Sequence, residues 1–314
     1  NFPRMHMRVG ELKKEDLKGE IWFQSNRTGK WDIWTMNADG SNLRNITNTA
    51  NEDEWWPRPS PDGKRVAYVV GGLKKINIWD MKNPGKRQVW VTDRDGKNAK
   101  LLAENATRPS WGPDGKVIVY TKLEKKQQRI CVHHLDTDKI THPTDKWKSW
   151  LRAGGEAIFA TKQRRLAIGG KLWTTTSGVL MVMDLDENYE PVKLKPLGTG
   201  YFGCNPQWSS TGERLYFAHH DPKHKGAIVL WTVKPDGTDP RRFETPTAKK
   251  WEGYGMYSES PDGTMIASRG WNTKDNWRQS IRVMRISDGA SMFVTTGEKK
   301  HIDGVPWWHA GVKE

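Results

Sequence analysis

The chain has 314 residues, and 51 Lys and Arg against 37 Asp and Glu give it a formal net charge of +14. Its mean hydropathy is −0.82, and no run approaches the ~18 apolar residues that span a bilayer, so a membrane-spanning helix is not expected. The two cysteines, Cys131 and Cys204, form no paired motif, which argues against a zinc ribbon, a thioredoxin site or covalently attached haem.

A tight turn between two apolar strands recurs along the chain. The clearest copies contain Pro-Asp-Gly and centre on Asp62, Asp114 and Asp262, while Thr211 marks a further copy and Lys162 a worn one. Pro presets φ, Asp bonds its own backbone and Gly accepts positive φ, so each copy predicts a hairpin. Successive markers are 52, 48, 49 and 51 residues apart, which indicates a repeat of about 50 residues.

A second signature accompanies the first. Apolar and polar residues alternate and then turn in six segments, namely 32–40, 88–96, 129–138, 179–188, 228–237 and 280–289. A short fourth strand follows each of them, as in 43–47. Four antiparallel strands repeated six times, with no convincing helical pattern between them, predict an all-β protein: a six-bladed β-propeller in one domain over residues 19–314.

The chain ends predict how the ring closes. The first unit begins with the strand at Gly19 to Phe23 and lacks the strand that precedes it in the other units, whereas the segment from Val305 to His309 matches that missing strand. We therefore expect the C-terminal strand to complete blade 1. Residues 1–18 precede the ring as an N-terminal extension.

The repeat resembles a known family. The segments 33–40 (Ile-Trp-Thr-Met-Asn-Ala-Asp-Gly) and 57–68, with its Ser-Pro-Asp-Gly-Lys-Arg-Val-Ala-Tyr, are similar to the TolB-type PD40, or WD40-like, repeat. That family includes the periplasmic TolB propeller, propeller domains of some peptidases and several polysaccharide lyases. The resemblance implies a periplasmic or other extracytoplasmic location, and the chain begins at Asn1 without a signal peptide, as expected of a processed form.

The two faces of the expected propeller differ in composition. The Asp-Gly turns fall on one face, and the remaining connections, rich in Trp and in Lys pairs such as Lys249-Lys250, fall on the other. A basic rim attracts anionic partners, so an acidic protein surface is expected there; the alternative is that these lysines only solvate the loops. The chain has no nucleic-acid-binding motif, and no nucleic-acid partner is expected.

Aromatic residues in those loops are the candidates for partner binding, because loops carry function on rigid scaffolds and Trp dominates interfaces. The alternative is that they form small local cores. The candidates are Trp55, Trp56, Trp147, Trp150, Lys250, Trp251, Glu252, Tyr254, Trp271, Trp277 and Trp307. The segment 245–257 is the most distinctive, since two glycines between aromatics permit sharp bends.

Two groups of histidines are candidates for a metal site. One comprises His301, Asp303 and His309, expected near the last connection, and the other comprises His219, His220 and His224. Imidazole and carboxylate ligands suit transition metals, but neither group has a specific motif, and surface histidines are the alternative. Whether these residues bind a metal ion therefore stays open, and no covalent cofactor is expected.

These features predict a protein-binding or scaffold subunit without its own catalytic centre, more often part of a hetero-oligomer than a lone monomer. A specific version is a subunit of a multihaem enzyme complex of the hydrazine synthase type. The alternative is a polysaccharide lyase or carbohydrate-binding propeller that acts on anionic glycans. No residue can be assigned as catalytic from the sequence, and no G-x-S-x-G elbow of a serine hydrolase is present.

Overall fold

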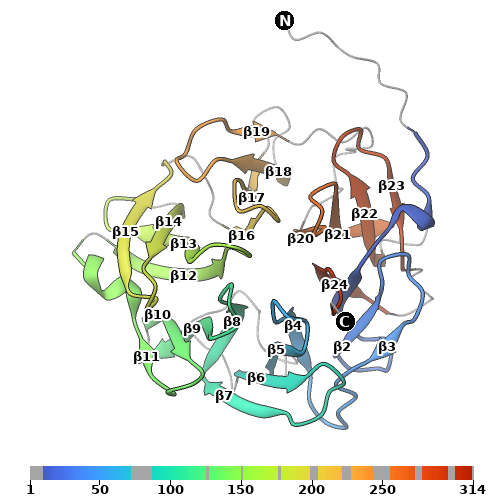
Figure 1. Ribbon diagram of the computed structural model, residues 1–314, viewed down its shortest axis with the longest axis horizontal. Helices are drawn as coiled ribbons and strands as arrows, with labels where there is room; N and C mark the ends of the chain where they lie inside the picture. Colours follow the sequence, from blue (N-terminus) through green and yellow to red (C-terminus); the bar gives the residue numbers. More distant parts are fainter. Residues whose placement is uncertain are drawn as a thin grey trace, which may run out of the picture.

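The computed structural model describes residues 10–71, 87–124, 127–149, 151–175, 178–198, 204–220, 228–242, 255–272, 278–295 and 301–312. Six four-stranded antiparallel sheets are arranged in a ring (Figure 1). The predicted six-bladed β-propeller is thus confirmed. The described part of the chain also contains two short 3-10 helices, η1 (Lys14–Asp16) and η2 (Pro143–Trp147).

The first three blades follow the predicted repeat. Blade 1 consists of β24 (Asp303–His309), β1 (Glu20–Ser25), β2 (Asp32–Asn37) and β3 (Arg44–Asn45). Blade 2 consists of β4 (Glu54–Pro59), β5 (Arg65–Val70), β6 (Gln88–Asp93) and β7 (Lys100–Glu104). Blade 3 consists of β8 (Ala106–Trp111), β9 (Val117–Glu124), β10 (Gln127–His134) and β11 (Ile140–Thr141).

The other three blades are built in the same order. Blade 4 consists of β12 (Leu151–Phe159), β13 (Arg165–Leu172), β14 (Val179–Leu185) and β15 (Pro191–Pro196). Blade 5 consists of β16 (Cys204–Trp208), β17 (Leu215–His220), β18 (Ile228–Val233) and β19 (Arg241–Arg242). Blade 6 consists of β20 (Gly255–Glu259), β21 (Met265–Asn272), β22 (Arg278–Arg285) and β23 (Ser291–Phe293).

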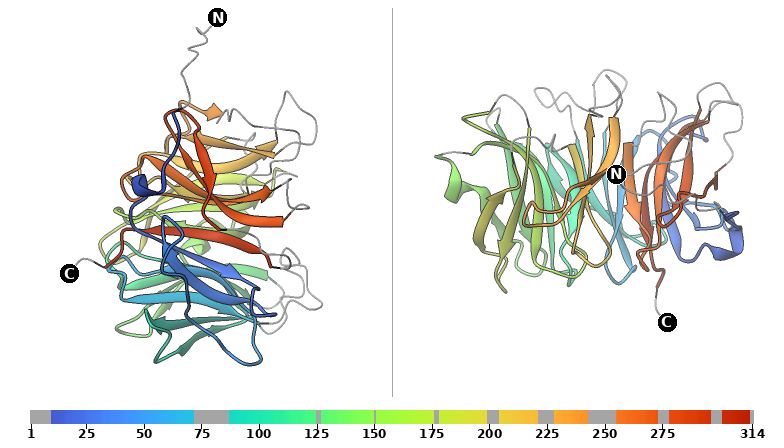
Figure 2. Two further views of the ribbon diagram at one scale, coloured as in Figure 1. Left: turned by 90° about the vertical axis from the view of Figure 1, so that its right-hand side faces the viewer. Right: turned by 90° about the horizontal axis from the view of Figure 1, so that it is seen from above.

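The C-terminal strand closes the ring, as the sequence predicts. Strand β24 pairs antiparallel with β1, with Ile21 opposite Trp308 and Glu20 opposite His309. The first strand in each blade, such as β4, β8 or β24, lies innermost around the axis (Figure 1). We call the face with the Pro-Asp-Gly turns the turn face and the opposite one the loop face. The C-terminal end of the chain lies on the turn face (Figure 2).

The apolar core lies between neighbouring blades. Because adjacent residues of a strand point to opposite sides of the sheet, each blade contributes to two such cores. In β5, Val66 packs in a cluster with Trp22 of blade 1, whereas the next residue, Ala67, packs in a cluster with Tyr120 of blade 3. Each large apolar side chain that is fully buried in this way contributes about 1.5–3 kcal/mol.

The Asp-Gly turns have a packing role. Gly96 has a φ of +84°, and a Cβ there would lie 2.0 Å from the Ile46 carbonyl oxygen in the preceding blade. Gly40 and Gly237 likewise lie close to a backbone carbonyl of the preceding blade. Glycine at these turns is therefore required both by the backbone conformation and by the close approach of the neighbouring blade.

Part of the N-terminal extension is attached to the ring. Leu12 and Leu17 are buried in one cluster with Ile21 of blade 1 and Met265 of blade 6. The Lys18 carbonyl accepts a hydrogen bond of 2.8 Å from the Trp308 indole, next to the closing strand. No helix in the described ranges has the length and apolar character needed to cross a bilayer.

Candidate functional site

A cavity of about 240 Å³ opens at the centre of the turn face. Every blade contributes to its wall, and the wall includes prolines of three Pro-Asp-Gly turns. The lining residues from the inner strands include Arg58, Ser110, Phe159, Gln207, Ser258, Glu259 and Trp307. A propeller channel is a pre-formed concave site because the inner strands cannot approach the axis more closely without clashing.

One layer of this wall is polar and repeats from blade to blade. Arg58, Ser110, Gln207 and Ser258 each lie four residues before a turn marker, and all four are buried. Two of them hold the ring together: Ser110 Oγ accepts a bond of 3.0 Å from the Phe159 amide, and Ser258 Oγ accepts one of 2.9 Å from the Trp308 amide. These two serine hydroxyls therefore already accept hydrogen bonds from neighbouring blades.

The tryptophans at the ends of inner strands also connect blades. The Trp111 indole donates to the Arg58 carbonyl at 2.8 Å, and the Trp208 indole donates to the Ile158 carbonyl at 3.1 Å. Both side chains are buried. Both tryptophans therefore pack between neighbouring blades.

Arg58 differs from the rest of the polar layer because it brings a positive charge into the channel wall. Its guanidinium lies 4.4 Å from the centre of the Trp307 ring, and its Nη1 donates to the Pro57 carbonyl at 3.0 Å. Its Nε has no hydrogen-bond partner among the described residues. Burial lowers the pKa of Arg58 to about 10, an effect that the charge of Glu156 partly opposes. An anion bound in the channel beside this guanidinium would compensate its charge.

The inner strands bulge beside the channel. Trp56, Arg108 and Val305 have φ values of +51°, +57° and +51°, and each coincides with a register shift against the next strand. Such a conformation is unusual for these residue types, above all for the β-branched Val305. Bulges redirect side chains at barrel rims and near functional sites. Here they precede the residues that face the channel.

The structure corrects the placement of several predicted partner-binding residues. Trp55 and Trp56 do not lie on a loop; both are buried in strand β4, in the core between blades 2 and 3. Trp271 belongs to strand β21. Trp147 lies on η2 and is partly buried against the core between blades 3 and 4. Trp307 lines the channel.

The remaining predicted partner-binding residues lie outside the described residues. They are Trp150, Lys250, Trp251, Glu252, Tyr254 and Trp277. Of the predicted metal candidates, His224 also falls outside, while His219 and His220 belong to strand β17.

The first histidine group does not form one site. His301 Nε2 and Asp303 Oδ2 are 3.6 Å apart at the loop-face end of β24, where Asp303 also pairs with Arg27 at 2.9 Å. His309 is at the turn-face end, where its ring packs against Gly63. Seven strand residues separate the ends by roughly 20 Å. The prediction that His309 joins His301 and Asp303 is therefore wrong.

A buried carboxylate lies near that loop-face end. Glu54 is completely buried, and its Oε2 accepts a hydrogen bond of 3.1 Å from Thr47, while Thr49 donates to Oε1. Burial raises the pKa of Glu54 to about 7, and the nearby charge of Asp32 acts in the same direction. The hydroxyl donors oppose the increase but do not cancel it.

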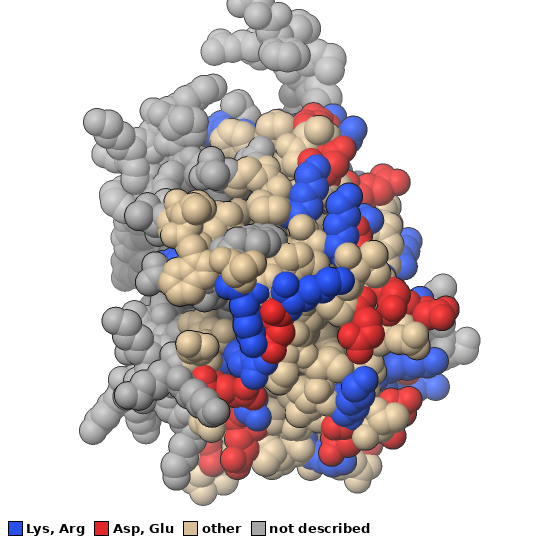
Figure 3. Space-filling view, turned by 90° about the vertical axis from the view of Figure 1, so that its left-hand side faces the viewer, with Lys and Arg blue, Asp and Glu red and all other residues tan. Residues whose placement is uncertain are grey.

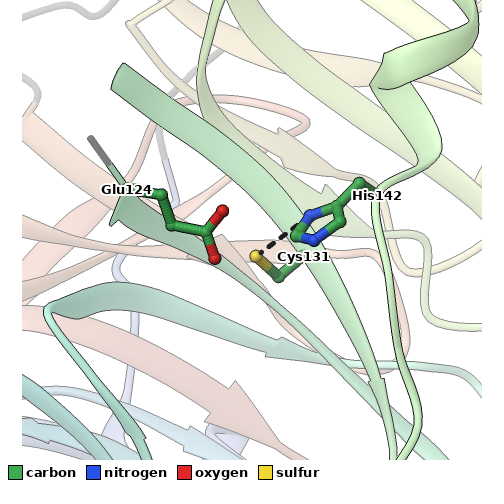
Figure 4. Close-up of side chains that lie close together, drawn as sticks. All are labelled: Glu124, Cys131 and His142. Carbon is green, nitrogen blue, oxygen red and sulfur yellow. Dashed lines mark hydrogen bonds between the residues drawn. The ribbon is translucent and has the colours of Figure 1, made fainter. Parts of the chain in front are cut away.

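A cluster that no sequence motif indicates lies in blade 3. Glu124, Cys131 and His142 bring one carboxylate, one thiol and one imidazole within 4.8 Å of one another (Figure 4). The Cys131 sulfur is 3.5 Å from His142 Nδ1. The three residues are separated by six and ten intervening positions without a recognisable metal motif, so only strand pairing reveals their proximity.

Charge on the outer wall is mixed. Lys and Arg side chains alternate with Asp and Glu on the side shown in Figure 3. A groove of about 340 Å³ between blades 4 and 5 shows the same alternation, with Arg165, Lys193, Lys195 and Lys234 beside Asp184 and Asp236. Two lysines, Lys146 and Lys148, lie in the described connection between blades 3 and 4, and Lys148 pairs with Asp145 at 3.0 Å.

Comparison with known sequences finds partial matches, and no family model matches the chain. An uncharacterized protein of Agrobacterium fabrum is 33% identical over 108 residues, which cover 32% of this chain and 36% of that protein. The Tol-Pal system protein TolB of Wigglesworthia glossinidia brevipalpis is 30% identical over 81 residues, or 25% of this chain and 17% of that protein. The matches thus span well under half of these relatives.

Comparison with solved structures covers nearly the whole chain. TolB from Acinetobacter baumannii superposes with a TM-score of 0.69 at 16% identity, over 92% of this chain and 66% of that one. A nidogen/laminin complex gives 0.62 at 10% identity, over 93% and 99%. An oligogalacturonate lyase from Vibrio parahaemolyticus gives 0.54 at 10% identity, over 90% and 75%. By its repeats and its architecture, this chain is a six-bladed β-propeller that is similar to TolB.

Proposed function

We propose that the protein is an extracytoplasmic, non-catalytic binding subunit that receives an acidic segment of a protein partner in its channel on the turn face. The observation that carries the proposal is the buried Arg58, which lies in the wall of a cavity lined by all six blades and whose Nε has no hydrogen-bond partner among the described residues. The net charge of +14 would favour the approach of an acidic partner.

The wall of the channel suits such a segment chemically. An arginine guanidinium binds a carboxylate through charge-assisted hydrogen bonds, and Trp307 beneath it offers a flat apolar surface. Arg and Trp are also the residue types enriched at the energetic centres of interfaces. The solved structures of similar fold support binding, since one belongs to a nidogen/laminin complex.

The loop face forms a second part of the proposal. Trp147 lies there on η2, with Lys146 Nζ 5.6 Å from its ring centre. Together with Lys250, Trp251 and Tyr254, it would contact a larger assembly. A multihaem complex of the hydrazine synthase type is the specific version of this assembly that the sequence suggested.

Photocrosslinking tests which face binds. A photoreactive benzoylphenylalanine replaces Trp307 in one variant and Trp147 in another, and native mass measurement follows irradiation in an extract of the source cells. We expect a defined adduct from position 307, with the crosslinked peptide of the partner rich in Asp and Glu. An adduct from position 147 alone would place binding on the loop face. A monomer without adducts in both variants would contradict the binding function.

An anionic glycan is the second candidate ligand. Trp307 beside Arg58 is also a suitable pair for a uronate sugar, and an oligogalacturonate lyase shares the fold. Oligogalacturonate titrated by calorimetry, with turnover followed by ultraviolet absorbance of the unsaturated product, distinguishes the two. Binding lost in Arg58→Met would favour the glycan, and turnover would establish an enzyme.

A further inference from the structure

We propose that Glu124, Cys131 and His142 form a binding site for a divalent transition metal of the zinc type. The site would link strands β9 and β10 to the connection between β11 and η2. It lies in blade 3, on the side that packs against blade 2, and is separate from the channel. The inference is independent of the partner-binding proposal.

The register of blade 3 explains why the three side chains lie on the same face of the sheet. Strands β10 and β11 pair with Val132 opposite Thr141, so continuing this register places His142 opposite Cys131. Strands β9 and β10 pair with Tyr120 opposite Cys131, and Glu124 follows Tyr120 by four residues on the same side of the sheet. Three different chain segments therefore present one ligand each to the same face.

The distances are close to those of a tetrahedral site. Bonds of about 2.3 Å to sulfur and about 2.0 Å to nitrogen at a tetrahedral angle place the two ligand atoms roughly 3.5 Å apart. The distance from Cys131 Sγ to His142 Nδ1 is 3.5 Å. The Glu124 carboxylate is within 4.8 Å and points toward the sulfur in Figure 4, so a side-chain movement of about 1 Å would complete the set.

The ligand types select the metal. One thiolate, one imidazole and one carboxylate suit Zn²⁺ and Co²⁺, whereas Mg²⁺ and Ca²⁺ prefer oxygen ligands alone. Three protein ligands leave a fourth tetrahedral position for water or an external ligand, as in open zinc sites.

Two cations hold the carboxylate in position. Arg129 Nη1 donates to Glu124 Oε2 at 2.9 Å, and Lys122 Nζ lies 3.8 Å from Oε1. The other guanidinium nitrogen, Nη2, pairs with Asp145 on η2. A carboxylate has about four acceptor positions, so a metal can bind while Arg129 keeps its hydrogen bond. Arg129 would then act as an outer partner that orients Glu124.

Metal binding would release one proton from the Cys131 thiol to solvent. Burial raises the pKa of this thiol to about 12, so the group is neutral near pH 7 without a metal. The bond between metal and sulfur forms as the S–H bond breaks, and a buried neutral thiol is replaced by a metal thiolate. Affinity should consequently rise with pH.

Titration with Co²⁺ tests the site in the full-length, tag-free, reduced protein. We expect binding of one Co²⁺ with a sulfur-to-cobalt charge-transfer band, displacement by Zn²⁺ and no effect of excess Mg²⁺. Cys131→Ser should remove the band. Glu124→Gln and His142→Gln should each weaken Co²⁺ binding by more than the ~10–100-fold typical of losing an outer partner.

Cys204→Ser is the matched control because it removes the other cysteine, and it should leave the band unchanged. Circular dichroism checks that each variant is folded. If Cys131→Ser fails to fold, Glu124→Gln tests the site in its place, because Glu124 is partly exposed. Co²⁺ that binds without a thiolate band, a band that disappears in Cys204→Ser, or affinity unchanged in Glu124→Gln and His142→Gln would each overturn the assignment.

Discussion

Replacement of Arg58 by methionine should make the protein more stable while it abolishes partner binding. The decrease in the pKa of Arg58 from 12.5 to about 10 corresponds to about 3 kcal/mol of unfavourable burial of the charge. Loss of its hydrogen bond to the Pro57 carbonyl and of its contact with Trp307 removes about 1 kcal/mol each. Methionine has a similar length, so the free energy of unfolding should rise by about 1 kcal/mol.

Urea unfolding at pH 7, followed by far-ultraviolet circular dichroism, measures this change. Arg65→Met is the matched control: its guanidinium lies 4.6 Å from the Trp111 ring centre and donates to the Gly115 carbonyl at 3.1 Å, but Arg65 is only half-buried. The control should lose about 1 kcal/mol, because it gives up contacts without relieving a deeply buried charge. If Arg58→Met is destabilised as much as the control, Arg58 is a structural residue and does not mark a binding site in the channel.

Three further predictions concern the scaffold. Burial raises the pKa of Glu54 from 4.5 to about 7, so its contribution to the free energy of unfolding is complete below the unfolded pKa and is lost as the pH rises through 7. In urea unfolding between about pH 5 and 8, Glu54→Gln should therefore remove about 3 kcal/mol of the pH dependence of that free energy. An unchanged pH profile in Glu54→Gln would contradict this. Gly96→Ala should lower the melting temperature far more than Gly29→Ala, where φ is also positive but the added Cβ would meet no atom of the described residues within 4 Å, chain neighbours aside. Equal losses would show that φ alone matters. Trp308→Ala should cost about 3–5 kcal/mol and speed hydrogen exchange in β1 by opening the ring, whereas unchanged protection of β1 would mean that β24 is not the closure.

The tandem hairpins and the closure of the ring were predictable because both depend on local chemistry. A Pro-Asp-Gly turn between two apolar strands forms a hairpin from its own residues, and the copy number then follows by counting. The strand at Val305 to His309 was identifiable as the missing inner strand because it matches the inner strands of the other repeats.

The candidate site was predictable only in part. Trp307 was expected to bind a partner and does line the channel, but Arg58 was not identified, because nothing in its local sequence shows that its guanidinium is buried. Trp55 and Trp56 were predicted as loop residues, because the repeat pattern does not show that β4 already begins at Glu54 or that it bulges at Trp56.

The sequence by itself determined the number of blades, the four-strand repeat and the closing strand, because turn chemistry and strand alternation act over a few residues. Only the tertiary structure decided which side chains meet across strands. It separated His309 from His301 by the length of β24, and it brought Glu124, Cys131 and His142 together through the register of blade 3. The reason is physical: register and bulges are set by packing between blades, which no single segment of the chain contains.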